Sequence, residues 1–393
     1  MQKFYIIGLN DNRHQNLTAD AISVIAKGKV FSGGKRHHEI IASLLPDQAL
    51  WIDITIPLSD VFMQYHNHQE IVIFASGDPL FFGFANTIHR EIPEADIKMF
   101  PSFNSLQTLA HRLLIPYQSM RNVSLTGRVW DALDEALING ESLIGVLTDH
   151  EKTPAAIANR MLEYGYDNYH MYVGEALGNE DDEQISSLTL EATIRKNFLF
   201  PNCLLLERTY QRKHLFGIPE SDFNLLNGRS KMITKMPVRL ATLSLLDLHN
   251  RHSFWDIGFC TGSVSIEAKL QFPHLQITAF EQRNEGSELM LKNCRKFGTP
   301  GIKSIIGNFL TINLSTLPAP DTVFIGGHGG QLIEILKKID QVLLPGGVIV
   351  FNSVSDESQR LFRTGIQEIN RQIIDCICIT VEQFNPIEII KAE

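Results

Sequence analysis

Short apolar segments alternate with amphipathic stretches along the whole chain, and this alternation is the feature that most constrains the fold. Apolar residues in the longer stretches recur at three- and four-residue spacing, which is typical of helices with one buried face. Helices of about 10–15 residues between strands are typical of the crossovers in parallel sheets. The pattern therefore predicts α/β architecture. The expected strands are segments 4–8, 70–75, 97–100, 142–147, 169–173 and 203–207 in the first half, and 253–257, 276–280, 303–306, 322–325 and 348–352 in the second.

The chain is too long for one ordinary core, because its 393 residues exceed the roughly 250–300 at which single domains stop growing. Residues 214–230 interrupt the alternation with turn formers, which is typical of a domain boundary. We therefore expect two domains, residues 1–213 and 214–393, and no sequence repeat relates them. A helix over 237–248 opens the second domain, and segments 373–381 and 387–390 are expected to close it as an antiparallel hairpin at the sheet edge.

The distribution of charge argues against a nucleic-acid partner. The net charge is −9, and residues 1–213 carry 18 Lys and Arg against 26 Asp and Glu, which leaves −1 for the remainder. Neither half has the broad basic surface that a phosphate backbone requires. The acidic stretch 178–184 is expected to be a solvated loop.

The five cysteines and the hydropathy indicate a cytoplasmic protein. The cysteines are odd in number and contain no C-x-x-C pair, which favours reduced thiols over disulfides or a metal site. No apolar run approaches the roughly 18 residues of a membrane-spanning helix, so no membrane partner is expected.

The strongest local motif follows the first expected strand of the second domain. Asp256 is followed by Gly258 and Gly262, and the chain then passes directly into a helix. Glycines at such a turn let a ligand approach the backbone, and the helix N-terminus offers free N–H groups. Glu281 ends the next strand, where a carboxylate can accept hydrogen bonds from both ribose hydroxyls of a nucleoside. The combination favours a nucleoside cofactor over a purely structural turn.

The spacing D-x-G-x-x-T-G resembles motif I of the class I S-adenosylmethionine methyltransferases, with Cys260 at a position that is commonly glycine. Together with segments 232–239 and 320–327, it resembles the decarboxylating precorrin methyltransferases of cobalamin biosynthesis over residues 214–393. The resemblance implies a Rossmann-like domain with a mostly parallel, seven-stranded sheet. It also implies that S-adenosylmethionine contacts Thr234, Gly258, Phe259, Cys260, Thr261, Gly262, Glu281, Asn308 and Phe309.

In the first half, the segment A-S-G-D-P-L-F-F-G at 75–83 follows an expected strand, and P-S-F-N-S-L follows at 101–106. Alone, G-D-P predicts a turn. Together the two segments resemble the tetrapyrrole (class III) methyltransferases, specifically the carbon-5 precorrin enzymes, over residues 1–213. The resemblance implies a two-lobed fold in which S-adenosylmethionine contacts Ser76, Gly77, Asp78, Phe81, Asn104, Ser105 and Leu147.

The order of the two halves resembles the bifunctional, decarboxylating precorrin methyltransferases. This implies one S-adenosylmethionine per domain, a precorrin substrate methylated at carbons 5 and 15, loss of carbon dioxide from the ring C acetate, and a homo-oligomer. No residue stands out as a general acid or base, and no metal-ligand cluster is present. Two alternatives stay open, namely methylation of RNA and a non-catalytic scaffold that binds S-adenosylmethionine.

A substrate with many carboxylates requires cations near each site. Lys231, Lys235 and Arg239 are spaced by four and share one face of a helix or helix entry, where they either bind the substrate or form a solvated face. His328 lies in a glycine-rich loop after a strand and is a candidate substrate contact or proton donor, although loop histidines are often incidental. The segment Lys35–His38 is similarly basic, and nothing in the sequence ties it to a site.

Overall fold

A computed structural model describes residues 1–12, 14–226, 232–380 and 387–392. The chain forms two compact units. The first contains residues 1–128, 141–159 and 169–209, and the second contains 129–140, 160–168 and 210–393. The expected division at residues 213 and 214 stays a prediction, since the two short segments 129–140 and 160–168 belong to the second compact unit.

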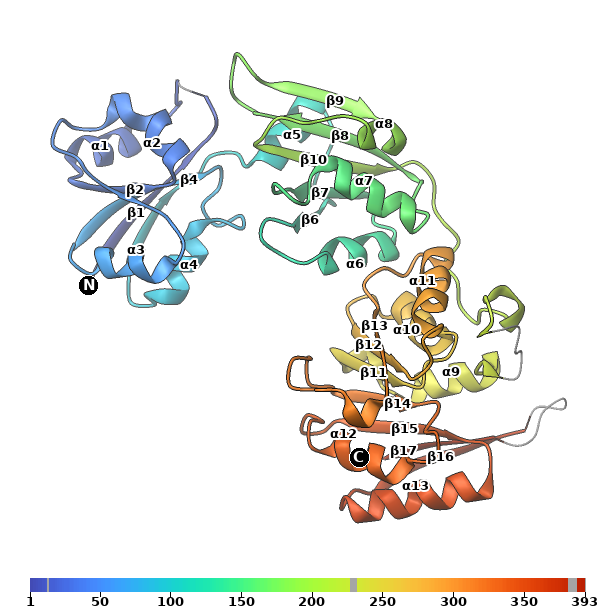
Figure 1. Cartoon of the computed structure of the whole chain (residues 1–393). Helices are drawn as coiled ribbons and strands as arrows, with labels where there is room; N and C mark the ends of the chain where they lie inside the picture. Colours follow the sequence, from blue (N-terminus) through green and yellow to red (C-terminus); the bar gives the residue numbers. More distant parts are fainter. Residues whose placement is uncertain (13, 227–231, 381–386, 393) are drawn as a thin grey trace. The chain divides into compact units, whose positions relative to one another are not determined.

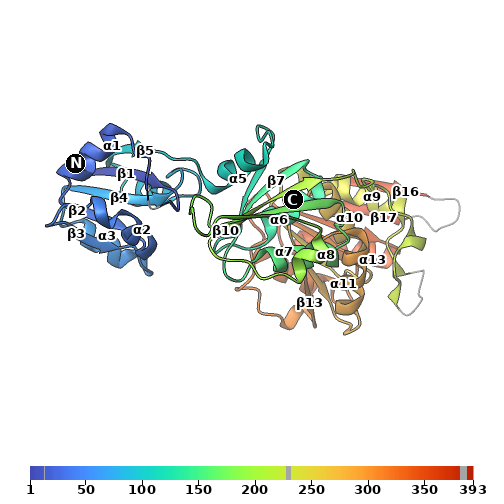
Figure 2. The same cartoon turned by 90° about the horizontal axis from the view of Figure 1, so that it is seen from above.

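The first unit begins with a parallel five-stranded sheet, blue in Figures 1 and 2, whose strand order is β3-β2-β4-β1-β5. Alternate residues of β1 face opposite sides, so that Phe4 and Ile6 pack with Tyr65 of α3 while Ile7 packs with Ile25 of α1. The sheet is therefore buried on both faces. Its elements are β1 (Lys3–Leu9), α1 (Ala19–Lys27), β2 (Val30–Gly33), α2 (Lys35–Ile41), η1 (Ala42–Leu44), β3 (Leu50–Asp53), α3 (Leu58–Tyr65), β4 (Glu70–Ser76), α4 (Phe84–Glu91) and β5 (Asp96–Phe100).

A second, mixed five-stranded sheet follows in the order β6-β7-β10-β8-β9, with only β6 and β7 parallel. Leu106 and Leu109 of α5 pack against Leu143 and Leu205 of this sheet. Two separate sheets confirm the two-lobed fold predicted for the first half. The elements are α5 (Ser105–Leu113), β6 (Arg121–Ser124), α6 (Asp131–Asn139), β7 (Leu143–Leu147), α7 (Pro154–Glu163), β8 (Tyr169–Glu175), β9 (Gln184–Leu188), α8 (Leu190–Ile194) and β10 (Asn202–Arg208).

The second unit holds a seven-stranded sheet in the order β13-β12-β11-β14-β15-β17-β16, parallel except for the ladders made by β17. Phe254 of β11 packs in one apolar cluster with buried residues of α9 and α10. Its neighbour Trp255 packs in another cluster, with buried residues of α12 and α13. The predicted Rossmann-like architecture is confirmed. The elements are η2 (Glu220–Asp222), α9 (Met236–Leu245), η5 (Leu248–Asn250), β11 (Ser253–Ile257), α10 (Ser263–Gln271), β12 (Gln276–Glu281), α11 (Gly286–Phe297), β13 (Lys303–Ile306), η6 (Phe309–Thr311), β14 (Thr322–Ile325), α12 (Leu332–Asp340), β15 (Val348–Ser353), α13 (Asp356–Glu368), β16 (Ile373–Ile379) and β17 (Ile387–Ala392).

Four strands were not expected from the sequence, namely β2, β3, β6 and β9. β6 and β9 are mostly polar, so the pattern of apolar residues did not reveal them, and β2 and β3 have only four residues each. The helix expected over 237–248 ends earlier, because Asp247 adopts a left-handed backbone conformation and starts a separate turn of 3₁₀-helix. Among the described residues, every helix is too short or too polar to span a lipid bilayer.

Candidate functional site

A cavity of about 450 Å³ lies at the carboxyl edge of the seven-stranded sheet. Its walls include the ends of β11, β12 and β14 and the residues that directly follow β11, β12, β13 and β14. This volume falls within the range of roughly 300–1,000 Å³ that is typical of small-molecule sites. Eight of the predicted site residues line the cavity: Thr234, Gly258, Phe259, Cys260, Glu281, Asn308, Phe309 and His328. Thr261 and Gly262 lie at the entry to α10 and do not line it.

The loop after β11 has a backbone shape that few side chains tolerate. Gly258 has a φ of +77°, and a Cβ atom there would lie 2.7 Å from the backbone nitrogen of Gly327. Gly262 has a φ of +75°, and a Cβ atom would lie 2.3 Å from Sδ of Met290. Cys260, at the commonly glycine position, also adopts a positive φ of 52°. The loop therefore keeps its tight form with cysteine in place of glycine, at the cost of some backbone strain.

The thiol of Cys260 is buried, and burial raises its pKa. A thiol with a raised pKa carries little thiolate at neutral pH and is a weak nucleophile. The side chain thus acts as a packing residue in the loop.

Glu281 ends β12 and is 4% exposed. Its carboxylate accepts hydrogen bonds from the backbone nitrogens of Cys260 (2.9 Å), Gln282 (2.9 Å) and Arg283 (3.1 Å). The Arg283 side chain donates to both oxygens, with Nε 2.8 Å from Oε1 and Nη2 2.9 Å from Oε2. Burial alone would raise the pKa of Glu281, but these donors lower it below its usual value. Glu281 is therefore a fixed carboxylate anion at the cavity wall.

Asp256 also lines the cavity, and the sequence analysis did not assign it to the site. The residue is 1% exposed, and its Oδ2 accepts a hydrogen bond of 2.6 Å from Ser265. Its Oδ1 is buried and has no hydrogen-bond partner in the described part of the chain. Burial raises the pKa of Asp256 to about 7. An unpaired, buried carboxylate oxygen at a cavity wall is suited to a cationic ligand group. The acid before the glycines was visible in the sequence, but its unpaired oxygen was not.

Asn308 precedes the short helix η6, and Phe309 is the first residue of that helix. The Asn308 side chain caps η6 by accepting a hydrogen bond of 2.9 Å from the backbone nitrogen of Leu310. Phe309 packs edge-on against Phe280, with ring centroids 5.0 Å apart. Lys338 of α12 donates to the carbonyl oxygens of Phe309 (2.8 Å), Leu310 (2.7 Å) and Ile312 (2.6 Å). The Asn308 cap and the Lys338 hydrogen bonds together fix the segment from Asn308 to Ile312.

The predicted substrate cations do not form one group. Lys231 lies outside the described residues. Lys235 is the half-buried residue that precedes α9. Arg239 is fully buried, and its Nε lies 2.5 Å from Oε2 of Glu267. Its remaining donors reach the carbonyl oxygens of Thr234 (2.8 Å) and Ile218. The expectation that Arg239 faces the substrate is therefore corrected, because four-residue spacing defines a helix face but not whether that face is exposed.

His328 lies in the glycine-rich loop after β14 and lines the cavity. Its Nδ1 accepts a hydrogen bond of 3.2 Å from the backbone nitrogen of Gly330. Burial lowers the pKa of His328, so the imidazole is neutral at neutral pH. A neutral imidazole with Nδ1 occupied presents an Nε2–H donor.

In the first unit, three segments meet at the carboxyl edge of the parallel sheet. The backbone nitrogen of Gly77 donates to the carbonyl oxygen of Leu9 (2.7 Å), and Ser102 donates to that of Gly77 (3.3 Å). A Cβ atom on Gly77, whose φ is +59°, would lie 2.7 Å from Cα of Asn104. Asn104 caps α5 by accepting a hydrogen bond of 2.9 Å from Gln107. The G-D-P loop and the start of α5 are thus adjacent, as the resemblance implied.

The other predicted residues of this site are Ser76, Asp78, Phe81, Ser105 and Leu147. Asp78 accepts a hydrogen bond of 2.9 Å from the backbone nitrogen of Leu80 and shapes the loop. Phe81 and Leu147 belong to the same apolar cluster. Ser105 contacts Cys203, which pairs with Leu147 in the second sheet. Ser76 turns the other way and contacts Arg36 and His37 of the basic segment that the sequence left unassigned.

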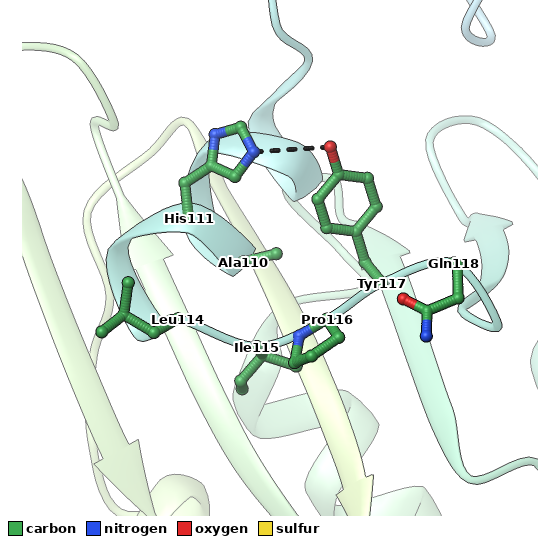
Figure 3. Close-up of a pocket in the computed structure, with 7 residues that line it drawn as sticks. All are labelled: Ala110, His111, Leu114, Ile115, Pro116, Tyr117 and Gln118. Carbon is green, nitrogen blue, oxygen red and sulfur yellow. Dashed lines mark hydrogen bonds between the residues drawn. The ribbon is translucent and has the colours of Figure 1, made fainter.

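A wide depression elsewhere in the first unit holds none of the predicted residues (Figure 3). It follows the end of α5, where the Tyr117 hydroxyl lies 3.4 Å from Nε2 of His111. The walls are mostly apolar and carry no other titratable side chain among the residues that line it. We therefore do not regard it as a site of chemistry.

Comparisons with known proteins cover both halves of the chain. The family model for tetrapyrrole (corrin/porphyrin) methylases matches residues 3–193, and that for the precorrin methyltransferase domain matches residues 227–388. The precorrin-6Y C(5,15)-methyltransferase (decarboxylating) of Sinorhizobium is 29% identical over 355 residues, which are 90% of this chain and 85% of the relative.

Two further relatives each match less than half of the chain. The cobalt-precorrin-6B C(15)-methyltransferase (decarboxylating) of Salmonella typhimurium is 33% identical over 162 residues, 41% of this chain and 83% of the relative. A solved structure of a precorrin-6Y C5,15-methyltransferase from Geobacter metallireducens is 33% identical, covers 45% of this chain and 96% of its own, and has a TM-score of 0.41.

Proposed function

Because the chain belongs to the family of decarboxylating precorrin methyltransferases, we propose that it methylates a precorrin at carbons 5 and 15 in cobalamin biosynthesis. The second reaction is coupled to loss of the ring C acetate carboxyl as carbon dioxide. The observation that carries this proposal is that both family models match, in this order, along a chain that aligns with a bifunctional relative over 90% of its length.

The family uses S-adenosylmethionine, and we infer one cofactor site in each domain. In the second domain, Glu281 is proposed to accept hydrogen bonds from the ribose hydroxyls, and Asn308 and Phe309 to contact the adenine. Asp256 is proposed to pair with the ammonium group, because the residue lines the cavity and its Oδ1 has no hydrogen-bond partner among the described residues. Gly258 lets the loop after β11 pack closely against the loop after β14, since any side chain there would meet the backbone of Gly327.

The carboxylate of Glu281 already accepts five hydrogen bonds, whereas its two oxygens offer about four lone-pair positions. Ribose hydroxyls must therefore replace the side-chain donors of Arg283. Arg283 is about one-third exposed, so its guanidinium has room to turn toward solvent.

In the first domain, Gly77, Asp78 and the start of α5 are proposed to hold the second cofactor. A Cβ atom on Gly77 or on Gly8 would collide with neighbouring backbone, so both positions require glycine. Phe81 and Leu147 would supply apolar contact from the shared cluster.

S-adenosylmethionine supplies an electrophilic methyl group, so the protein mainly has to align the reacting carbon with it and exclude water. We propose that Lys235 and His328 contact the substrate in the second domain, where His328 presents its Nε2–H. A cytoplasmic location, a homo-oligomeric state and the absence of a nucleic-acid partner stay predictions from the sequence.

The test is mass spectrometry of the products formed from metal-free and cobalt-bound precorrin-6B with S-adenosylmethionine. Two added methyl groups and one lost carbon dioxide are expected, and the better substrate decides between the metal-free and cobalt-bound forms. Cofactor binding without turnover of either tetrapyrrole would contradict the proposal and favour a scaffold.

A further inference from the structure

The basic segment after β2 meets the end of β4 at the carboxyl edge of the first sheet. The hydroxyl oxygen of Ser76 lies 2.9 Å from Nε2 of His37 and 3.2 Å from Nη2 of Arg36. Nη1 of Arg36 lies 3.5 Å from Oδ1 of Asp11, in the loop after β1. Strands β2, β4 and β1 are adjacent in the sheet, so these side chains gather over its centre. Ligands of α/β proteins bind at this edge.

Apart from the Asp11 carboxylate, which pairs with Arg36, the side chains of this cluster act as hydrogen-bond donors. The backbone nitrogen of Gly34 donates to Nδ1 of His37 (3.3 Å), so a neutral imidazole carries its proton on Nε2. That Nε2–H and the Arg36 N–H both donate to the Ser76 oxygen and use its two lone pairs. The Ser76 hydroxyl proton is therefore the group that this residue offers to a ligand.

His37 keeps this arrangement across the physiological pH range. Burial, with a smaller effect of the neighbouring Arg36 charge, lowers the pKa of His37 to about 4. The imidazole is thus an uncharged donor that fixes Ser76, while the positive charge is carried by Arg36. The Arg36 side chain is 40% exposed and uses two of its five N–H groups in the contacts with Asp11 and Ser76.

An exposed hydroxyl donor beside an exposed guanidinium is suited to a carboxylate. Two sources exist, namely the cofactor and the tetrapyrrole. Gly77, the next residue, faces Leu9 and Asn104 on the β1 side of β4. Ser76, which the resemblance assigned to the cofactor, instead contacts Arg36 and His37 of α2, and the Arg36 guanidinium also reaches Asp11 after β1. Because the tetrapyrrole carries many carboxylates, we take the substrate as the ligand.

We propose that Arg36 and Ser76 bind a carboxylate of the tetrapyrrole substrate in the first domain, and that His37 is the positioning residue that orients Ser76. This inference rests on the proposed function. Arg36 is then a specificity-determining residue for methylation at carbon 5 and has no part in the reactions of the second domain.

The test uses the full-length protein with precorrin-6B, and follows carbon-5 methylation by mass spectrometry and cofactor affinity by calorimetry. Arg36→Gln is expected to raise KM for the tetrapyrrole about ten- to a hundredfold, the range of a lost charged hydrogen bond. The affinity for S-adenosylmethionine and the decarboxylation by the second domain should change less than about twofold. An unchanged affinity for S-adenosylmethionine at the first site shows that the first domain is folded, and the unchanged second reaction shows the same for the second domain.

Further variants test whether His37 orients Ser76 or only stabilises the fold of the first domain. His37→Gln keeps an N–H donor and should raise KM less than His37→Leu, which removes it. Arg90→Gln is the matched control, because Arg90 is an exposed arginine of α4 that pairs only with its neighbour Glu91 among the described residues.

Each other outcome contradicts the inference. An unchanged KM in Arg36→Gln overturns it. Weaker cofactor binding at an unchanged KM assigns the carboxylate to S-adenosylmethionine and also overturns it. If the wild-type protein methylates no tetrapyrrole at carbon 5, the proposed function fails first, and the inference fails with it.

Discussion

Glu281 is the residue whose replacement tests the second cofactor site most directly. Glu281→Gln keeps the size of the side chain and removes its charge. We expect S-adenosylmethionine to bind about tenfold more weakly to the second domain, because charge-assisted hydrogen bonds are stronger than neutral ones. Calorimetry on the full-length chain measures this. Unchanged affinity would remove the assignment of Glu281 to the ribose.

Glu281→Ala has a second effect that the sequence did not indicate. A carboxylate at an exposed cleft could be removed without effect on the fold. In the structure the Glu281 carboxylate is buried and accepts the backbone N–H of Cys260. Leaving a buried donor unpaired costs about 1–3 kcal/mol. The alanine variant should therefore lose stability as well as cofactor affinity, and the glutamine variant is the cleaner test.

Asp256 gives cofactor binding a pH dependence. Its pKa is raised to about 7 by burial, so below that pH the carboxyl is mostly protonated. Pairing with an ammonium group requires the ionised form, so affinity should rise as the pH increases toward 7. Binding below pH 7 should release a proton. Calorimetry in buffers of different ionisation enthalpy detects this proton, and Asp256→Asn should abolish both effects. Proton release that persists in Asp256→Asn would contradict the assignment.

The same raised pKa affects stability with a definite sign. Between about pH 4 and 7, the folded protein holds a proton on Asp256 that the unfolded chain has lost. The contribution of this carboxyl to stability is therefore greatest below its unfolded pKa and declines as the pH rises through that window.

At the scale of elements, the Arg239–Glu267 pair connects α9 to α10. Both side chains are fully buried. Glu267 also accepts hydrogen bonds from the backbone nitrogens of Gly217 and Ile218, so the pair fixes the segment that precedes α9. Loss of the Arg239–Glu267 ion pair should loosen the segment around Thr234, because the Thr234 carbonyl oxygen accepts a hydrogen bond from Arg239.

Arg239→Met should lower the free energy of unfolding by about 3–5 kcal/mol, because it leaves the Glu267 carboxylate buried and unpaired. The double variant Arg239→Met with Glu267→Leu should be more stable than this single variant, since no buried charge is left. Chemical denaturation of the full-length chain measures both. Arg363→Met is the control, because Arg363 is an exposed arginine of α13. A loss below about 1 kcal/mol in Arg239→Met would contradict the structural role.

At the scale of the whole molecule, we expect the two sites to be inactivated separately. A Cβ atom at Gly77 would collide with Asn104, and one at Gly258 with Gly327. Gly77→Ala should therefore abolish methylation at carbon 5 and preserve decarboxylation, whereas Gly258→Ala should do the reverse. Mass spectrometry of the products formed by the full-length variants distinguishes these outcomes.

Two glycines provide matched controls for these variants. Gly127 and Gly346 also have positive φ values, but a Cβ atom at either meets no neighbour within 4 Å. Their alanine variants carry the backbone strain without the collision and should retain both reactions. Loss of both reactions in Gly77→Ala or in Gly258→Ala would mean that the sites depend on each other.

Local sequence determined the fold class, the parallel core of the seven-stranded sheet and the loop that joins β11 to α10. These features rest on the periodicity of apolar residues and on glycines at fixed spacing, which act over a few residues. The sequence did not reveal β6 and β9 because most of their side chains are polar, and it also missed the four-residue strands β2 and β3.

Only the tertiary structure decided which polar side chains are buried and what they face. Arg239 became a buried ion-pair partner because α9 turns that position inward against Glu267. The contact of Ser76 with Arg36 and His37 joins segments about 40 residues apart, and it exists because β2 and β4 are neighbours in the sheet. Burial raises the cost of leaving polar groups unpaired, and burial is set by packing between distant segments. Helix spacing in the sequence therefore could not distinguish Arg239 from a substrate contact.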